Sequence, residues 1–190
     1  MRTLIVVDVQ NDFCEGGSMG VTGGANVASA VSRLIEEHRG DYAYVVATRD
    51  YHIDPGAHFS DHPDFVDSWP RHCVVGSSGA EFHPGFDASV ADAVFSKGEY
   101  TAAYSGFEGA AADGSLLAEW LRQRGVTEVD VVGIATDHCV RATALDAAAA
   151  GFTTRVLLGL TAGVTRETVD SALQQMRDAD VALDGEPVVA

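Results

Sequence analysis

Four reactive side chains lie at the ends of runs of apolar, β-branched residues. Asp8, Asp50 and Lys97 each close such a run, and Cys139 follows the run that ends at Ala135. Runs of this kind are typical of strands buried in a parallel sheet. Ligands of open parallel sheets bind outside the carboxyl ends of the strands. We therefore expect an acid, a second acid, a base and a thiol to meet at one rim of a sheet.

Each of these side chains also has a structural explanation. Asp8 could cap a turn or a helix, and Lys97 could be a solvated surface charge. Cys139 could fill the core, which is the commoner role of an unpaired cysteine. Taken singly, each residue favours that explanation. Their expected meeting at one edge favours chemistry, because independent structural roles give no reason for them to gather there.

The position of Cys139 suggests a reactive thiol. It lies in the first turn of a predicted helix over residues 137–150. The start of a helix presents unpaired N–H groups and a partial positive charge, which favour the thiolate and lower the thiol pKa. The same N–H groups can stabilise an oxyanion when the thiolate attacks a carbonyl. Asp8 could then shuttle the proton while Lys97 holds Asp8, an arrangement that needs no histidine.

A second group of polar residues begins at the end of the second predicted strand. Asp50 and His52 point to the same side of an extended chain, because one residue separates them. His58 and His72 follow in the segment 51–91, which is long, irregular and rich in Pro, Gly, His and Asp. One carboxylate and several imidazoles suit a first-row divalent metal ion, with water completing its coordination. The alternative is a set of surface histidines.

Strand and helix patterns alternate along the chain. Six segments have the composition of strands, at residues 3–9, 42–50, 93–98, 128–135, 153–159 and 181–185. Four segments are helical by spacing or composition, at residues 25–38, 115–124, 137–150 and 165–179. The alternation predicts an α/β fold with a mostly parallel, about six-stranded sheet and right-handed crossovers. We expect a single domain over residues 1–190, with the segment 51–91 inserted as a metal-binding loop.

Composition and charge exclude several classes of protein. The chain has 190 residues, of which 46% are apolar and 21% charged, an ordinary globular composition. Its formal net charge of −16 should repel nucleic acids and anionic membranes, so neither is an expected partner. There is no signal-peptide pattern and no apolar run of the roughly 20 residues that cross a bilayer. Three cysteines, an odd and sparse set, indicate a reducing compartment, and we expect a cytoplasmic protein.

Five sequence blocks follow one another between Met1 and about Ala179: DVQNDFCEGGS, TRDYHIDPGAHF, SWPRHC, FSKGEYTAAYSGFEG and VVGIATDHCVRATALDA. Together, in this order and spacing, they resemble the nicotinamidases of the isochorismatase-like cysteine hydrolase family. The resemblance implies a three-layer α/β/α fold with helices on both faces of a parallel sheet. It also implies hydrolysis of nicotinamide to nicotinate and ammonia through a cysteine thioester, in NAD salvage, and hydrolysis of pyrazinamide to pyrazinoate.

The resemblance also implies roles for individual residues. The implied catalytic residues are Asp8, Lys97 and Cys139. The implied metal ligands are Asp50, His52, His58 and His72, for one divalent ion of iron, manganese or zinc (Fe2+, Mn2+ or Zn2+). The peptide bond between Ile134 and Ala135 would be cis, and the N–H groups of Ala135 and Cys139 would form an oxyanion hole. The residues implied around the substrate ring are Phe13, Trp69, Tyr104, Ile134, Ala135 and His138.

Two other functions remain open. The first is a sister cysteine amidohydrolase that acts on another small amide or on an N-carbamoyl compound. The four expected metal ligands argue against it, because many relatives outside the nicotinamidases lack that set. The second is a non-catalytic metal- or ligand-binding protein on the same fold, with an inert Cys139. The expected partner is a small-molecule substrate, for either a monomer or a homo-oligomer.

Overall fold

The computed structural model describes all 190 residues of the chain. Its strands are β1 (Arg2–Val7), β2 (Tyr44–Asp50), β3 (Ala93–Lys97), β4 (Glu128–Ile134), β5 (Thr153–Gly163), β6 (Ala182–Asp184) and β7 (Val188–Val189). Its helices are α1 (Gly24–His38), α2 (Leu117–Gln123), α3 (Arg141–Ala149) and α4 (Arg166–Asp178). A π-helical turn, Thr136–Val140, leads directly into α3. None of the helices has the length and apolar character needed to cross a membrane.

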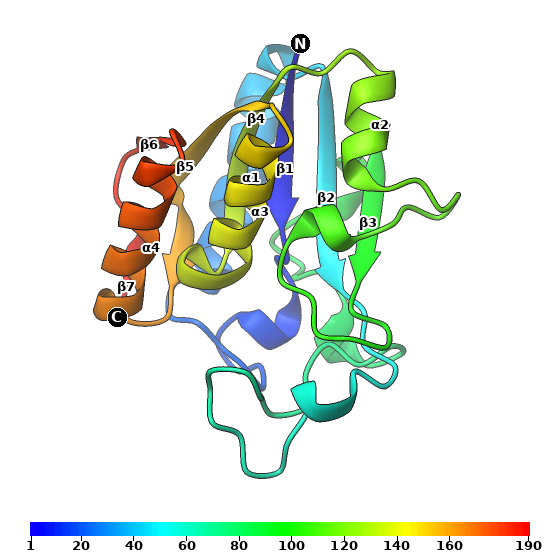
Figure 1. Cartoon of the computed structure of the whole chain (residues 1–190), viewed down its shortest axis with the longest axis vertical. Coiled ribbons are helices and arrows are strands. Elements are labelled where there is room, and N and C mark those ends of the chain that lie inside the picture. The colour runs from blue at the N-terminus through cyan, green and yellow to red at the C-terminus, as the bar shows by residue number, and fades with distance from the viewer.

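All strand pairings in the seven-stranded sheet are parallel. The strand order is β3-β2-β1-β4-β5-β6, and β7 pairs with the end of β5. Parallel neighbours need crossover connections, which α1, α2, α3 and α4 supply between successive strands. The connection from β2 to β3 is instead the irregular segment 51–91, which lies below the carboxyl ends of the central strands (Figure 1).

Helices cover both faces of the sheet. Successive residues of a strand point to opposite faces, and β1 shows the division clearly. Leu4 and Val6 belong to the core cluster that includes residues of α1. Ile5 and Val7 belong to the cluster that includes residues of α2, α3 and α4. In Figure 1 α1 lies behind the sheet and the other helices in front, so the expected three-layer α/β/α fold is confirmed.

The structure differs from the sequence-based expectation in three elements. Strand β7 is absent from that expectation because two residues carry no periodic pattern. Strand β5 runs to Gly163, past the expected end at Gly159, with an irregular register against β4. The predicted helix over residues 137–150 begins as the π-helical turn that carries Cys139. The other strands and helices lie where the sequence predicts them, within a few residues at each end.

Candidate active site

The carboxyl ends of β1, β2 and β3 bring Asp8, Asp50 and Lys97 together, as the sequence predicts. Asp8 leaves β1 with a φ of 48°, a left-handed conformation that is uncommon outside glycine. Its carboxylate accepts hydrogen bonds from the Thr48 hydroxyl at 2.7 Å and from the Lys97 ammonium at 2.8 Å. Asp8, Thr48 and Lys97 are all buried. The explanation of Lys97 as a solvated surface charge is therefore wrong.

The ammonium group of Lys97 serves three partners. Besides Asp8, it donates a hydrogen bond to the Asp50 carboxylate and lies 3.8 Å from Cys139 Sγ. Burial by itself disfavours the charged amine, but the carboxylates of Asp50 and Asp8 outweigh it and raise the pKa of Lys97 well above its ordinary value. Lys97 therefore stays charged and fixes both acids beside the thiol.

The two acids around Lys97 have pKa values displaced in opposite directions. Burial is the largest influence on Asp8 and raises its pKa, although Lys97 opposes it. Burial also raises the pKa of Asp50, but the charge of Lys97 and the adjacent His52 and His72 side chains outweigh it and hold that pKa well below its ordinary value. Opposite displacements of this kind separate proton carriers from permanent anions. Asp8 is suited to carry a proton, whereas Asp50 stays an anion.

The Cys139 thiol is buried next to these groups, with 7% of the residue exposed. Burial raises its pKa well above the ordinary value, and Asp8 and Asp50 add to that effect while Lys97 opposes it. The expectation that the helix start lowers this pKa is therefore wrong. Burial and two nearby carboxylates raise this pKa more than Lys97 lowers it. The thiol needs a base to take its proton, and Asp8 is the neighbouring group suited to that task.

Three histidines converge beside Asp50. His52, His58 and His72 are buried, and each offers a ring nitrogen within 4.8 Å of the others. Nε2 of His52 and Nε2 of His72 lie 3.5 Å and 3.6 Å from Oδ2 of Asp50. Burial, with smaller effects of His72 and His52, lowers the pKa of His58 to about 4. The His58 ring is therefore neutral near pH 7, the form that binds metal ions.

Backbone carbonyls orient two of these imidazoles. Nδ1 of His52 lies 2.6 Å from the Gly98 carbonyl oxygen, and Nδ1 of His72 lies 2.7 Å from that of Pro70. A carbonyl oxygen accepts a hydrogen, so Nδ1 of each ring carries a hydrogen and Nε2 is the nitrogen that can face a metal ion. Metal-binding histidines typically have a partner of this kind.

Buried nitrogens without partners show that these side chains fit a metal ion. Nε2 of His52 and Nδ1 of His58 have no hydrogen-bond partner. Leaving a buried polar atom unpaired is costly, so such atoms need an explanation. Imidazoles with one carboxylate are a donor set that first-row divalent ions prefer. The alternative of surface histidines is wrong for all three, because all are buried.

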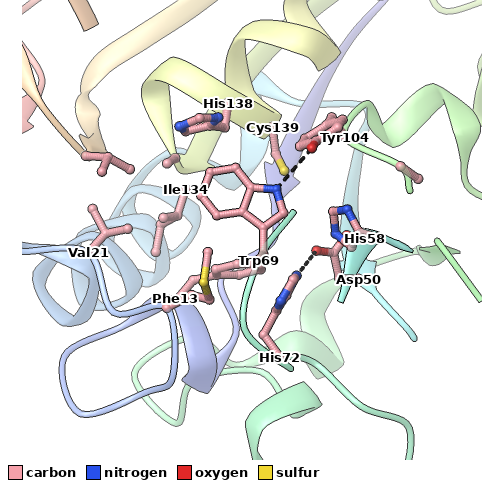
Figure 2. Close-up of a pocket in the computed structure, with 14 residues that line it drawn as sticks. Phe13, Val21, Asp50, His58, Trp69, His72, Tyr104, Ile134, His138 and Cys139 are labelled. Atoms are coloured by element: carbon pink, nitrogen blue, oxygen red, sulfur yellow. Dashed lines mark hydrogen bonds and ion pairs between the residues drawn. The ribbon is translucent and has the colours of Figure 1, made fainter. Parts of the chain in front are cut away.

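An apolar pocket opens beside the thiol and the histidines (Figure 2). Its empty space is about 500 Å³ when the open mouth is included. All the residues expected around a substrate ring line it, namely Phe13, Trp69, Tyr104, Ile134, Ala135 and His138. Cys139, Asp50, His58 and His72 line it too, whereas Asp8, Lys97 and His52 do not reach its surface.

Aromatic side chains fix the walls of this pocket. Figure 2 shows the Trp69 ring between Phe13 and Tyr104. The Trp69 Nε1–H donates a hydrogen bond to the Tyr104 hydroxyl at 3.1 Å, and the Trp69 ring meets His138 nearly perpendicularly, with ring centroids 5.4 Å apart. Phe13 lies 5.7 Å from the ring of His72. A flat aromatic ligand would therefore meet apolar, ordered surfaces.

The peptide bond Ile134–Ala135 precedes the π-helical turn that carries Cys139, and it is cis, as the resemblance implies. The Ala135 carbonyl accepts hydrogen bonds from the N–H groups of His138 at 3.1 Å and Val140 at 3.0 Å, which close the turn around Cys139. The Ala135 N–H donates to no backbone oxygen, and Ala135 lines the pocket. This N–H is thus available to an oxygen atom of a ligand.

Some residues of the site have no part in the sequence-based expectation. Thr48, which holds Asp8, lies two residues before Asp50 on β2, and that same-face spacing is a signal that could have found it. The remaining pocket-lining residues are Met19, Val21, Ala103 and Val164. These four lie in connecting segments, where no periodic pattern points to them.

Comparison with known proteins agrees with this geometry. An isochorismatase domain is matched over residues 2–184. The nicotinamidase/pyrazinamidase of Mycobacterium tuberculosis is 63% identical, over 96% of this chain and 98% of its own length. The pyrazinamidase of Pyrococcus horikoshii, solved in complex with zinc, is 37% identical with a TM-score of 0.81, over 96% of this chain and 97% of its own.

A protein of L. infantum solved in complex with nicotinate is 33% identical with a TM-score of 0.84, over 100% of this chain and 96% of its own. Sequence and fold thus agree over nearly the whole chain, and the pocket described above lies within the matched region. The chain belongs to the isochorismatase family of hydrolases, and within that family to the nicotinamidase/pyrazinamidase group.

Proposed function

We propose that the protein hydrolyses nicotinamide to nicotinate and ammonia, and pyrazinamide to pyrazinoate and ammonia, as a step of NAD salvage in the cytoplasm. One observation carries the proposal: a buried thiol beside Asp8 and Lys97 shares an apolar pocket with inward-facing histidine nitrogens. The thiol alone would suit many acyl transfers. The histidine cluster could hold a metal cation, and a ring nitrogen of the substrate could bind to that cation. The identity to the M. tuberculosis nicotinamidase/pyrazinamidase supports the same substrates.

The first half of the reaction makes a thioester. Asp8 takes the thiol proton of Cys139, and the thiolate attacks the carboxamide carbon. The N–H groups of Ala135 and Cys139 stabilise the negative oxygen that results. The intermediate collapses when the C–N bond breaks, and Asp8 returns the proton to the nitrogen, which leaves as ammonia. Lys97 keeps Asp8 at the sulfur throughout.

The second half releases the acid. Asp8, again unprotonated, takes a proton from a water molecule, and the oxygen of that water attacks the thioester carbon. The same two N–H groups stabilise the second oxyanion. The C–S bond then breaks, the acid leaves and ionises to nicotinate, and the proton on Asp8 returns to the Cys139 thiolate. Asp8 therefore acts twice as a base and twice as an acid, while its hydrogen bond from Lys97 holds it in place.

Asp50, His52, His58 and His72 would hold one divalent ion, and iron, manganese and zinc all accept this donor set. When bound, the ion supplies a Lewis-acidic anchor for the pyridine nitrogen of the substrate, directly or through water. The protein's own part is to present deprotonated nitrogens and a permanent carboxylate, and to hold the ring between Phe13 and Trp69. The Pyrococcus horikoshii pyrazinamidase is itself in complex with zinc.

A small panel of amides tests this proposal. Ammonia release should be fast for nicotinamide and pyrazinamide, and at least about a hundredfold lower in kcat/KM for benzamide, which lacks the ring nitrogen. An N-carbamoyl amino acid serves as the probe for a sister amidohydrolase. Fastest turnover of the N-carbamoyl compound, or equal turnover of benzamide and nicotinamide, would overturn the proposed substrate class.

A further inference from the structure

The hydrogen-bond ladder between β1 and β2 stops beside the active site. Val7 pairs with Thr48, and the Asp8 N–H donates to the Thr48 carbonyl at 3.1 Å. In a continued parallel ladder the Asp50 N–H would next donate to the Asp8 carbonyl, and the Gln10 N–H to the Asp50 carbonyl. Asp8 instead turns away with its φ of 48°, and the Gln10 N–H donates to the Asp8 carbonyl at 2.8 Å.

The side chain of Gln10 replaces the missing peptide groups. Its Oε1 accepts a hydrogen bond from the Asp50 N–H at 2.9 Å, and its Nε2 donates to the Asp50 carbonyl at 2.8 Å. The second hydrogen on Nε2 goes to the Ala80 carbonyl at 2.9 Å. Gln10 is fully buried, so water cannot take over these bonds. A carboxamide carries the same donor and acceptor as a peptide group, which is why it can complete the ladder.

This arrangement resolves a conflict between two neighbouring acids. Asp8 must leave the sheet for its carboxylate to accept hydrogen bonds from Lys97 and Thr48. Asp50 must stay in register with β3, where it pairs with Lys97. Its Oδ2 then lies 3.5 Å and 3.6 Å from the nitrogens of His52 and His72, so small shifts of the Asp50 backbone would change both distances.

We infer that Gln10 is a positioning residue, whose carboxamide holds the backbone of Asp50 so that this carboxylate and the histidines form one metal site. The inference rests on the proposed function in that Asp50 is taken as a metal ligand. Groups that orient metal ligands typically change metal affinity by 10- to 100-fold when removed. Gln10 acts through Asp50 and does not line the pocket.

Zinc affinity of the metal-stripped protein tests the inference without any assay of turnover. Gln10→Met keeps the length and burial of the side chain but removes its three hydrogen bonds. Gln10→Asn keeps the amide but shortens its reach. Tyr42→Phe is the matched control, because it removes a buried hydrogen bond to Asp130 outside the site. Each protein is titrated with zinc against a chromophoric chelator, and circular dichroism reports its folding.

We expect at least about tenfold weaker zinc binding in Gln10→Met, and wild-type affinity within about twofold in Tyr42→Phe. If Gln10→Met does not fold, Gln10→Asn takes its place with the same tenfold threshold. Wild-type zinc affinity in a folded Gln10 variant would overturn the inference and leave the proposed function intact. A wild-type protein that binds no zinc, iron or manganese would overturn the proposed metal site and this inference together.

Discussion

Buried aspartates lie at both ends of the sheet, Asp130 at one end and Asp8 and Asp50 at the other, and they have different partners. Asp130, towards the amino end of β4, accepts two hydrogen bonds from Arg155, at 3.0 Å and 2.6 Å, and one from the Tyr42 hydroxyl at 2.9 Å. The side chain of Arg155 is 38% exposed, so its charge keeps contact with water. At the carboxyl ends of the strands, Lys97, the chain's only lysine, is buried between Asp8 and Asp50.

The difference lies in what each cluster leaves unpaired. The Asp130 cluster matches one acid with the Arg155 guanidinium and the Tyr42 hydroxyl, and the Arg2 guanidinium lies 3.9 Å away, so both carboxylate oxygens have partners. In the Lys97 cluster two acids and a thiol share one ammonium group. Beside them lie nitrogens of His52 and His58 that have no hydrogen-bond partner. Titratable groups whose pKa values are strongly displaced by burial and by neighbouring charges are found mainly at functional sites. Mutations at the carboxyl ends should therefore change activity first, and mutations at the amino ends should change stability alone.

The largest expected effect is that of Cys139→Ala. Because the sulfur forms the covalent bond to the acyl group and no neighbouring side chain can replace it, ammonia release should fall by at least about 10⁴-fold. The bound metal should remain, since Cys139 is not among its ligands. Steady-state ammonia release and metal analysis on one preparation measure both. Residual turnover within tenfold of the wild type would show that Cys139 is not the nucleophile.

Lys97→Met should lower kcat by about a hundredfold or more, because Asp8 loses the group that fixes it at the sulfur. It should also lower the free energy of unfolding by about 3 kcal/mol, since two buried carboxylates lose their cation. Urea unfolding and ammonia release measure the two effects. Near-normal kcat in Lys97→Met would remove the distinction between the two acid clusters, because Lys97 would then serve stability alone.

His58→Ala, or removal of the metal by a chelator, should abolish nicotinamide turnover but leave alkylation of Cys139 by iodoacetamide within about an order of magnitude. Burial, Lys97 and Asp8 have the largest influence on the thiol pKa, and neither Lys97 nor Asp8 is an expected metal ligand, whereas Asp50, a smaller influence, is one. Asp50 contacts Lys97 and thereby links the metal ligands to the thiol, so we expect some change in the alkylation rate, but less than about tenfold. An unchanged thermal melt with a hundredfold slower alkylation would show that the metal tunes the thiol.

Sequence reasoning found the residues that secondary structure positions and missed what tertiary packing decides. Asp8, Asp50 and Lys97 end strands, so the rule that parallel strands deliver side chains to one rim was sufficient. The pKa of Cys139 depends on burial and on acids from other strands, which no local pattern reveals, and the local argument gave the wrong direction. The hydrogen bonds of Gln10 to Asp50 could not be predicted, because they depend on where the pairing of β1 with β2 stops. That point is set by the left-handed backbone conformation of Asp8, which the sequence does not reveal.

The smallest expected effect is that of Tyr42→Phe. Its hydroxyl donates to Asp130, and burial together with Asp130 raises the pKa of Tyr42, so the group remains a donor over the whole working range of pH. Losing this bond should lower the free energy of unfolding by about 1–2 kcal/mol, because Arg155 still satisfies both carboxylate oxygens. The catalytic rim keeps all its contacts, so kcat/KM should stay within about twofold. Urea unfolding and ammonia release on the same sample decide the matter: a tenfold loss of kcat/KM would mean that the two ends of the sheet are coupled, and the division between a stabilising and a reactive cluster would fail.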